Sequence, residues 1–257
     1  RCSSTRSGLL WGKKDKQCNA DDPADQGLGS VWDHVAFDPE SKLAITVVPG
    51  KRGVANIRRA VKDFAGRTNG VPPELITSDA YKPYRDVLLE VYGEKKPVKR
   101  RHRRGRPPKP RRVPPPGMVY AVVHKVRRKG RVVRVNVRLV FGFEEQLRVA
   151  LQASSVSQHV NIAYVERYNA TDRHLNSRKA RKVYSFSKHP LFHEAATYFT
   201  QGIYNFCCHN RGLTIKTRAG SRSRLTHRTP AMASGITDHI WPVEQFVCYQ
   251  ACPPVTI

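Results

Sequence analysis

The chain has 257 residues, and its 46 Lys and Arg against 20 Asp and Glu give a formal net charge of +26. A surplus of this size is rare without a polyanionic partner, so we expect the chain to bind nucleic acid. No apolar run of about 18 residues occurs, which excludes a membrane-spanning helix. The sequence contains no basic amphipathic helix with a Trp, Phe and Leu face, so we do not expect binding to an acidic membrane surface.

The start of the chain, RCSSTRSGLLWGKK, lacks the apolar stretch of a secretory signal. It also lacks an initiator Met, so we expect a fragment or a processed piece. The six cysteines form no pair of CxxC motifs, and Cys207, Cys208 and His209 are too close together for an ordinary tetrahedral zinc site. We therefore predict free intracellular thiols rather than structural zinc.

The first 94 residues predict alternating strands and helices. Residues 31–48 are typical of two strands joined by a turn at 38–41. Residues 53–67 have apolar side chains at helical spacing, a short strand ends at Asp79, and residues 84–93 form another helix. The order strand, strand, helix, strand, helix indicates a three-layer α/β fold.

The composition changes in residues 95–143, where no acidic residue lies between Glu94 and Glu144. The first part holds eleven Lys or Arg from 95 to 112, with seven prolines from Pro97 to Pro116, and predicts an extended, mobile arm. The second part alternates Val with Arg around Gly130, which predicts a β-hairpin with a cationic face. We interpret 95–143 as an insertion between two parts of one domain, 1–94 and 144–257.

The arm contains RGRPPK, with Arg104, Arg106 and Lys109. A narrow Gly-Arg-Pro segment can lie along the minor groove of A·T-rich DNA. The simpler alternative, which we prefer, is a charged linker that contacts phosphates without reading sequence. Either alternative predicts DNA binding that weakens steeply with salt.

After residue 143 the sequence predicts mainly helices. Residues 144–155 favour one helix, a long basic helix runs from about Ile162 to about Lys182, and residues 193–206 favour an apolar helix. The segment from Arg211 is expected to be basic and loop-like until residue 228.

Two carboxylates stand out because they lie in different surroundings. Asp79 ends a short strand, and Glu166 lies near the start of the long basic helix; acids so placed can build a divalent-metal site for phosphoryl transfer. At helical spacing Asn169 and Arg173 share the face of Glu166, where they would contact a neighbouring phosphate. Further basic residues follow toward the end of the helix and would face DNA: Arg178, Lys179, Arg181 and Lys182. The alternative is a solvated surface helix in which Glu166 pairs with neighbouring Arg.

Four segments together carry a resemblance: ITSDAYKPY, YVERYNATDRHLNSRKARKVYSFSK, YFTQGIYNF and RTPAMASGITDHIW. They resemble the insertion-sequence-one-type transposases, which cut and join DNA with an Asp-Asp-Glu triad on a ribonuclease-H-like fold. The resemblance implies an α/β fold with a mixed sheet and helices on both faces. It also implies two Mg²⁺ or Mn²⁺ ions held by three carboxylates.

By this resemblance Asp79 is the second carboxylate and Glu166 the third. The first departs from the family pattern, because aligning residues 11–14 with the matching family segment places Thr5 where an Asp is expected. Asp38, at the end of the next strand, is the weaker candidate to stand in for it. A missing carboxylate removes charge where metal binding needs it.

The first functional hypothesis is therefore a transposase catalytic domain that cleaves double-stranded transposon ends and joins them to target DNA; the missing first carboxylate would make this copy a truncated or inactive one. The second is a non-catalytic DNA-binding protein derived from a transposase, favoured by Thr5. The third is a structure-specific nuclease on the same fold. The resemblance implies homo-oligomers on DNA, no membrane partner, and an intracellular location: the bacterial cytoplasm and nucleoid, or a nucleus in a eukaryotic host.

Overall fold

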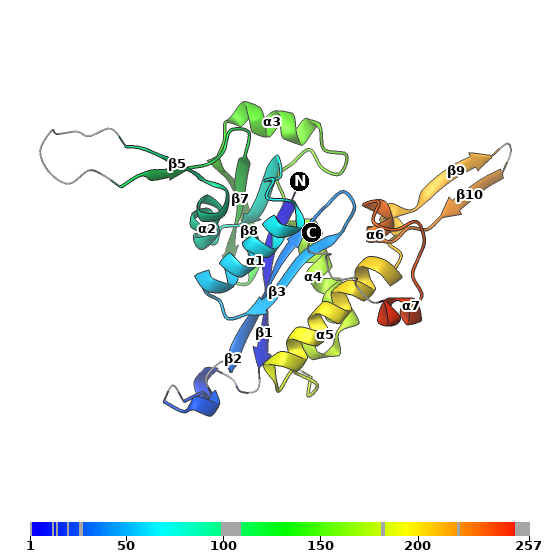
Figure 1. Cartoon of the computed structure of the whole chain (residues 1–257), viewed down its shortest axis with the longest axis horizontal. Helices are drawn as coiled ribbons and strands as arrows, with labels where there is room; N and C mark the ends of the chain where they lie inside the picture. The colour runs from blue at the N-terminus through cyan, green and yellow to red at the C-terminus, as the bar shows by residue number, and fades with distance from the viewer. Residues whose placement is uncertain are drawn as a thin grey trace, which may run out of the picture.

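The structure is a computed structural model, and it describes residues 2–11, 13, 15–19, 21–25, 28–98, 109–180, 183–219 and 222–249. It is a mixed α/β fold, as expected from the sequence. Six strands form a sheet in the order β3-β2-β1-β4-β7-β8 (Figure 1). These strands are β1 (Cys2–Trp11), β2 (Gly29–Phe37), β3 (Ala44–Gly50), β4 (Leu75–Asp79), β7 (Val119–Arg128) and β8 (Arg131–Phe141).

The sheet is mixed in direction. Strands β1, β2 and β3 are antiparallel neighbours, β4 and β7 run parallel to β1, and β8 returns antiparallel to β7. The carboxyl ends of β1, β4 and β7 therefore point to the same edge of the sheet, where open α/β sheets bind ligands.

Sequence reasoning does not predict strand β1. Its segment, CSSTRSGLLW, is rich in Ser and has no regular alternation. Nevertheless it lies between β2 and β4 and pairs with both. The neighbouring strands supply hydrogen-bond partners on both sides of β1. Strand preference depends on such neighbours, so the local sequence alone does not predict this strand.

Helices cover both faces of the sheet. Helices α1 (Val54–Arg67) and α2 (Pro83–Tyr92) pack on one face, against Ile76, Tyr120 and Val122. Helix α4 (Ala163–Leu175) packs on the other face, against Val35 and Val123, and α5 (Pro190–Gly202) contacts β3. Alternate residues of β7 thus serve opposite cores, as the period of two in a strand requires.

The segment 95–143 differs from the predicted insertion. Strand β7 pairs with β4 inside the sheet, so the second part of the segment belongs to the core. The predicted hairpin is confirmed: Lys129 and Gly130, between β7 and β8, both have positive φ, 49° and 78°, as a two-residue hairpin turn requires.

The first part of that segment projects from the body of the molecule (Figure 1). Its base is a short antiparallel ladder of β5 (Glu94–Lys96) and β6 (Arg111–Val113), rather than the unstructured chain predicted there. Arg112 donates to the carbonyls of Leu89 and Glu90 near the end of α2, where a cation is favourable.

The second half of the chain is mainly helical, as predicted. Helix α3 (Glu144–Gln152) follows β8, and the basic helix α4 ends at Leu175 rather than near Lys182. It ends there because Asn176 adopts an extended conformation and its side chain accepts a hydrogen bond from the backbone N–H of Arg178, at 3.1 Å.

The last part of the chain has more regular structure than predicted. Strands β9 (Ile215–Ala219) and β10 (Arg222–Thr226) form a second projecting hairpin, and two short helices follow, α6 (Pro230–Ala233) and α7 (Val243–Cys248) (Figure 1). Local pairing of two basic, β-capable segments explains this hairpin, which the charge pattern alone does not suggest.

Candidate nucleic-acid site

Asp79 lies at the carboxyl end of β4, a position set by the chain around it. Residues 75–78 are buried and pair with β7, whereas Pro83 stands at the first turn of α2. A proline suits a helix start and cannot continue a strand, so the chain turns directly after Asp79. The carboxylate therefore lies where β4 ends, between β1 and β7, which both continue beyond it.

Glu166 lies in the first turn of α4, and the start of this helix is tied to β4. The Thr77 hydroxyl donates to the carbonyl of Asn161, at 3.3 Å, and the Asn161 side chain accepts from the backbone N–H of Ala163, at 3.2 Å. Val165 and Tyr168 anchor the inner face of the helix in the core. A carboxylate in the first turn is favourable next to the helix dipole.

As a result, Asp79 and Glu166 line one pocket of about 320 Å³, although they lie far apart in the sequence. The pocket contains more cationic than acidic side chains, because Arg52, Lys125 and Arg127 also line it. Its remaining described lining residues are Ala80, Tyr81, Val123, His124 and Ile162. A site with this balance can hold a phosphate next to its two carboxylates.

Two of these cations have defined partners. The Lys125 ammonium lies 2.6 Å and 2.5 Å from the two oxygens of the Glu166 carboxylate. The Arg52 guanidinium lies over the rings of Trp32 and Tyr81, at 5.5 Å and 4.8 Å from their centroids, which holds it at the pocket. Sequence reasoning flagged the cationic hairpin that holds Lys125 but did not identify Arg52, whose only signal is the basic pair after Gly50.

Position 5 lies at the level of Asp79. Ser4 is paired with Ser78, so Thr5 and Asp79 are the next residues along two adjacent parallel strands. The backbone register thus brings the position where the family pattern expects an acid beside the second carboxylate. Thr5 itself supplies no carboxylate there.

Asp38 has a different role from the predicted stand-in. Its carboxylate accepts hydrogen bonds from the backbone N–H groups of Glu40 and Ser41, at 3.1 Å and 3.0 Å, and so closes the turn between β2 and β3. In the register of β1 with β2, Thr5 pairs with Val35, so Asp38 lies beyond the far end of that pairing. The structure therefore contradicts Asp38 as a substitute ligand.

The predicted phosphate contacts fall into three groups. Arg178 and Lys109 are exposed and Arg173 is half-buried. Asn169 is 5% exposed and Lys179 is 1% exposed, so both predictions of a DNA contact are wrong. The rest lie outside the described residues: Arg104, Arg106, Arg181 and Lys182.

Lys179 belongs instead to a buried charged cluster. Its ammonium lies 2.9 Å from Asp33 of β2 and 2.7 Å from Asp172 of α4, and His193 of α5 lies 3.8 Å from Asp33. Ser187 and His193 share a hydrogen bond of 2.7 Å. The cluster joins β2, α4, α5 and the segment between the two helices, which the charge pattern of the sequence does not reveal.

The pKa values in this cluster follow from burial opposed by charge. Burial raises the pKa of Asp172, and the Lys179 ammonium only partly opposes it. Burial also acts upward on the pKa of Asp33, but Lys179 and His193 outweigh it and hold that pKa below its ordinary value. For Lys179, burial acts downward and the two carboxylates outweigh it, so its pKa is raised.

The donor set of the pocket fits a divalent cation in part. Asp79 and Glu166 offer the hard oxygen ligands that Mg²⁺ takes from proteins, usually one or two carboxylates with water and substrate phosphates. Within the described side chains, no three His, Cys, Asp or Glu gather as a metal-binding group. The residues thus suit one ion better than the two that the resemblance implies.

Comparison of the chain with protein-family models, curated proteins and solved structures gives no significant match. In the part of the chain that the structure describes, no helix has the length and apolar character needed to cross a bilayer.

Proposed function

We propose that the chain is the catalytic domain of a DNA transposase of the Asp-Asp-Glu type on a ribonuclease-H-like fold, with the first carboxylate of its triad replaced by Thr5. The observation that carries the proposal is that Asp79 and Glu166 line one pocket at the carboxyl end of β4. The backbone register, which sets position 5 beside Asp79, supports position 5 as that of the missing third ligand. Helices on both faces of a mixed sheet agree with the resemblance.

The cations of the pocket suit double-stranded DNA as the substrate. Arg52, Lys125 and Arg127 surround the two carboxylates and would bind the phosphates that flank the reacting one. The projecting hairpins add further Lys and Arg that contact the backbone of transposon ends or target without reading sequence. We also propose that several copies of the chain assemble on the two transposon ends, in the compartment that holds DNA.

Asp79 and Glu166 would hold a Mg²⁺ or Mn²⁺ ion in this pocket. When bound, such an ion activates the attacking hydroxyl and neutralises charge on the transferred phosphoryl group. Lys125 balances the charge of Glu166, and the aromatic rings of Trp32 and Tyr81 orient Arg52 toward the substrate. Compared with an Asp at position 5, Thr5 leaves the site with one negative charge less, which weakens cation binding.

The decisive experiment compares the chain with its Thr5→Asp variant on supercoiled plasmid in the presence of Mn²⁺. We expect the chain to bind plasmid and nick it slowly or not at all, and Thr5→Asp to gain Mn²⁺-dependent nicking. Adding Asp79→Asn to Thr5→Asp should abolish that gain. Nicking that persists in the Thr5→Asp, Asp79→Asn double variant would show that the site is wrongly assigned.

A non-catalytic DNA-binding protein is the second candidate, favoured by Thr5 and by the ion pair of Lys125 with Glu166. It predicts equal DNA affinity with and without Mn²⁺, and no gain of nicking in Thr5→Asp. Strong salt dependence of DNA binding is common to both candidates, so it does not separate them.

A further inference from the structure

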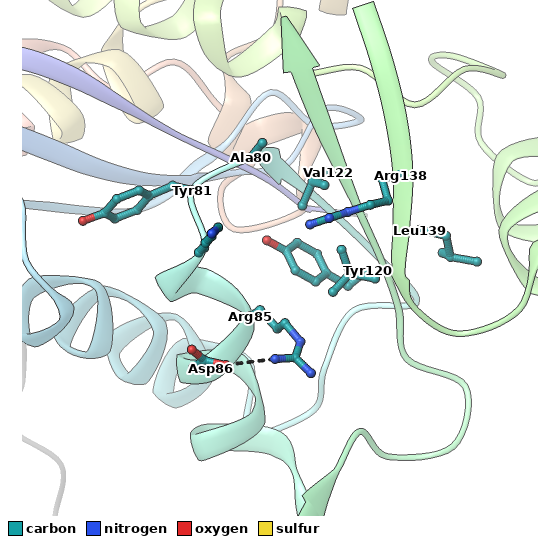
Figure 2. A pocket seen from close by; sticks show the side chains of 10 residues that line it. Ala80, Tyr81, Arg85, Asp86, Tyr120, Val122, Arg138 and Leu139 are labelled. Carbon is teal, nitrogen blue, oxygen red and sulfur yellow. Dashed lines mark hydrogen bonds and ion pairs between the residues drawn. The ribbon is translucent and has the colours of Figure 1, made fainter.

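A second pocket lies on the opposite face of the sheet from Glu166. It has a volume of about 490 Å³ and is lined by the turn after β4, the start of α2, and strands β7 and β8 (Figure 2). Among its described lining residues, Lys82, Arg85 and Arg138 are the cations and Asp86 is the acid. Lys82 is the N-cap of α2 and Arg85 lies in its first turn, whereas Arg138 belongs to β8, so the fold brings cations from two elements together.

Tyr120 forms the floor between these cations. In Figure 2 its ring lies between Arg138 of β8 and Arg85 of α2. Its hydroxyl is fixed by a hydrogen bond of 2.7 Å with Ser78, and the Ser78 hydroxyl donates to the carbonyl of Asp79, at 2.8 Å. The side chain is 1% exposed, so the floor is rigid and built into the core.

The cations of this pocket remain available to a ligand. Among the described side chains, Arg85 forms an ion pair with Asp86, at 3.4 Å, and both side chains are largely exposed, so that the pair contributes little. Arg138 is exposed, and its charge acts on the Tyr120 phenol. Guanidinium groups converging on a hollow are suited to phosphate, which they bind through two parallel hydrogen bonds.

The two pockets are neighbours. Ala80 and Tyr81, directly after Asp79, line both of them. A nucleic-acid strand that crosses this turn would place one phosphate beside Asp79 and Glu166 and another in the second pocket. The two pockets thus share the turn that follows β4.

We propose that the pocket of Lys82, Arg85, Arg138 and Tyr120 is a phosphate-binding subsite for the nucleic-acid strand whose reacting phosphodiester lies at Asp79 and Glu166. The location of the reacting phosphodiester at Asp79 and Glu166 rests on the proposed function, whereas phosphate binding in this pocket does not. It holds the strand against the turn at Ala80 and Tyr81, and so fixes the position of the scissile phosphate.

The test compares Arg138→Gln and Arg85→Gln with Arg134→Gln, which removes the same charge from β8 outside the pocket. Affinity for a fluorescent single-stranded oligonucleotide is measured by polarisation at several salt concentrations. We expect a loss of about tenfold for each pocket variant, with a salt slope lower by about 0.7, and at most a twofold loss for Arg134→Gln. Equal losses in all three variants, or none, would overturn the subsite.

Arginine side-chain NMR separates this proposal from the proposed chemistry. The Nε–H signals of Arg85 and Arg138 are assigned by their loss in the two variants. Titration with inorganic phosphate, and then with the oligonucleotide, should shift these signals, whereas chloride at equal ionic strength should not. These shifts without any nicking by Thr5→Asp would leave the subsite standing and the catalytic proposal rejected. Nicking by Thr5→Asp without these shifts would support the catalytic proposal and reject the subsite. Circular dichroism of each variant, and Arg138→Lys as a charge-preserving control, identify losses caused by misfolding.

Discussion

The Lys125 ammonium lies within hydrogen-bond distance of both oxygens of the Glu166 carboxylate, at 2.6 Å and 2.5 Å. The two residues come from a strand and a helix on either side of the pocket that Asp79 also lines. The ammonium therefore takes the place at Glu166 that a divalent cation would need. Competition between Lys125 and a metal ion follows from this geometry.

Replacement of Lys125 by Met should tighten Mn²⁺ binding about threefold, because the exposed pair contributes modestly and its loss frees the Glu166 carboxylate. Electron paramagnetic resonance of free Mn²⁺ measures the affinity. Lys129→Met, at the exposed hairpin turn, is the matched control and should leave the affinity unchanged. An unchanged Mn²⁺ affinity in Lys125→Met would mean that Glu166 is not a ligand.

Sequence reasoning singled out Asp79 and Glu166 as candidates because each stands at a boundary that local patterns specify. Asp79 ends an apolar strand before a proline-started helix, and Glu166 opens an amphipathic helix. It did not place Lys179, because a Lys within RKARK is typical of a solvated helix face. Its burial depends on Asp33, a residue from a distant strand, and no local pattern contains that information.

The same distinction holds for the fold. Strands and helices with regular periodicity were predictable, such as β4 and α1. Strand β1 was not, since its pairing with β2 and β4 arises only in the assembled sheet. The second pocket also escaped prediction, because Lys82, Arg85 and Arg138 converge only after the β7–β8 hairpin joins the sheet beside α2.

Two glycines should respond in opposite directions to replacement by Ala. A Cβ added at Gly66, in helix α1, or at Gly130, in the hairpin turn, meets no atom within 4 Å. Gly66→Ala should stabilise the fold by about 0.5–1 kcal/mol through helix propensity. Gly130→Ala should destabilise it by about 1–2 kcal/mol, because φ is 78° there.

Urea unfolding monitored by circular dichroism measures both free energies. An equal effect of the two substitutions would contradict the backbone conformations assigned to these positions. Gly70→Ala, where φ is also positive and the space is open, is a second variant that should destabilise.

Tyr120 should ionise late in alkali. Burial raises the pKa of Tyr120 to about 12, and the Ser78 hydrogen bond only partly opposes this. The pKa of Tyr120 in the folded chain lies above its ordinary value of 10.0. The contribution of the neutral phenol to the free energy of unfolding is therefore fully present below pH 10.0 and is lost as the pH rises through the folded pKa. The difference in absorbance near the phenolate band between the chain and Tyr120→Phe should therefore have its midpoint near pH 12. A midpoint at the ordinary value, with a native circular dichroism spectrum, would contradict the rigid floor of the second pocket.

Lys179 should be essential to the fold rather than to DNA binding. Replacing it by Met leaves the buried carboxylates of Asp33 and Asp172 without their shared cation, which should cost about 3–5 kcal/mol of unfolding free energy. Arg178→Met is the matched control, because Arg178 is the exposed neighbour in the same turn and should change stability by at most about 0.5 kcal/mol. Denaturant unfolding gives both values, and oligonucleotide affinity is measured on whichever variants remain folded. If Lys179→Met retained full stability but lost oligonucleotide affinity, Lys179 would have to reach the nucleic acid, and the buried cluster would not be the state of the molecule in solution.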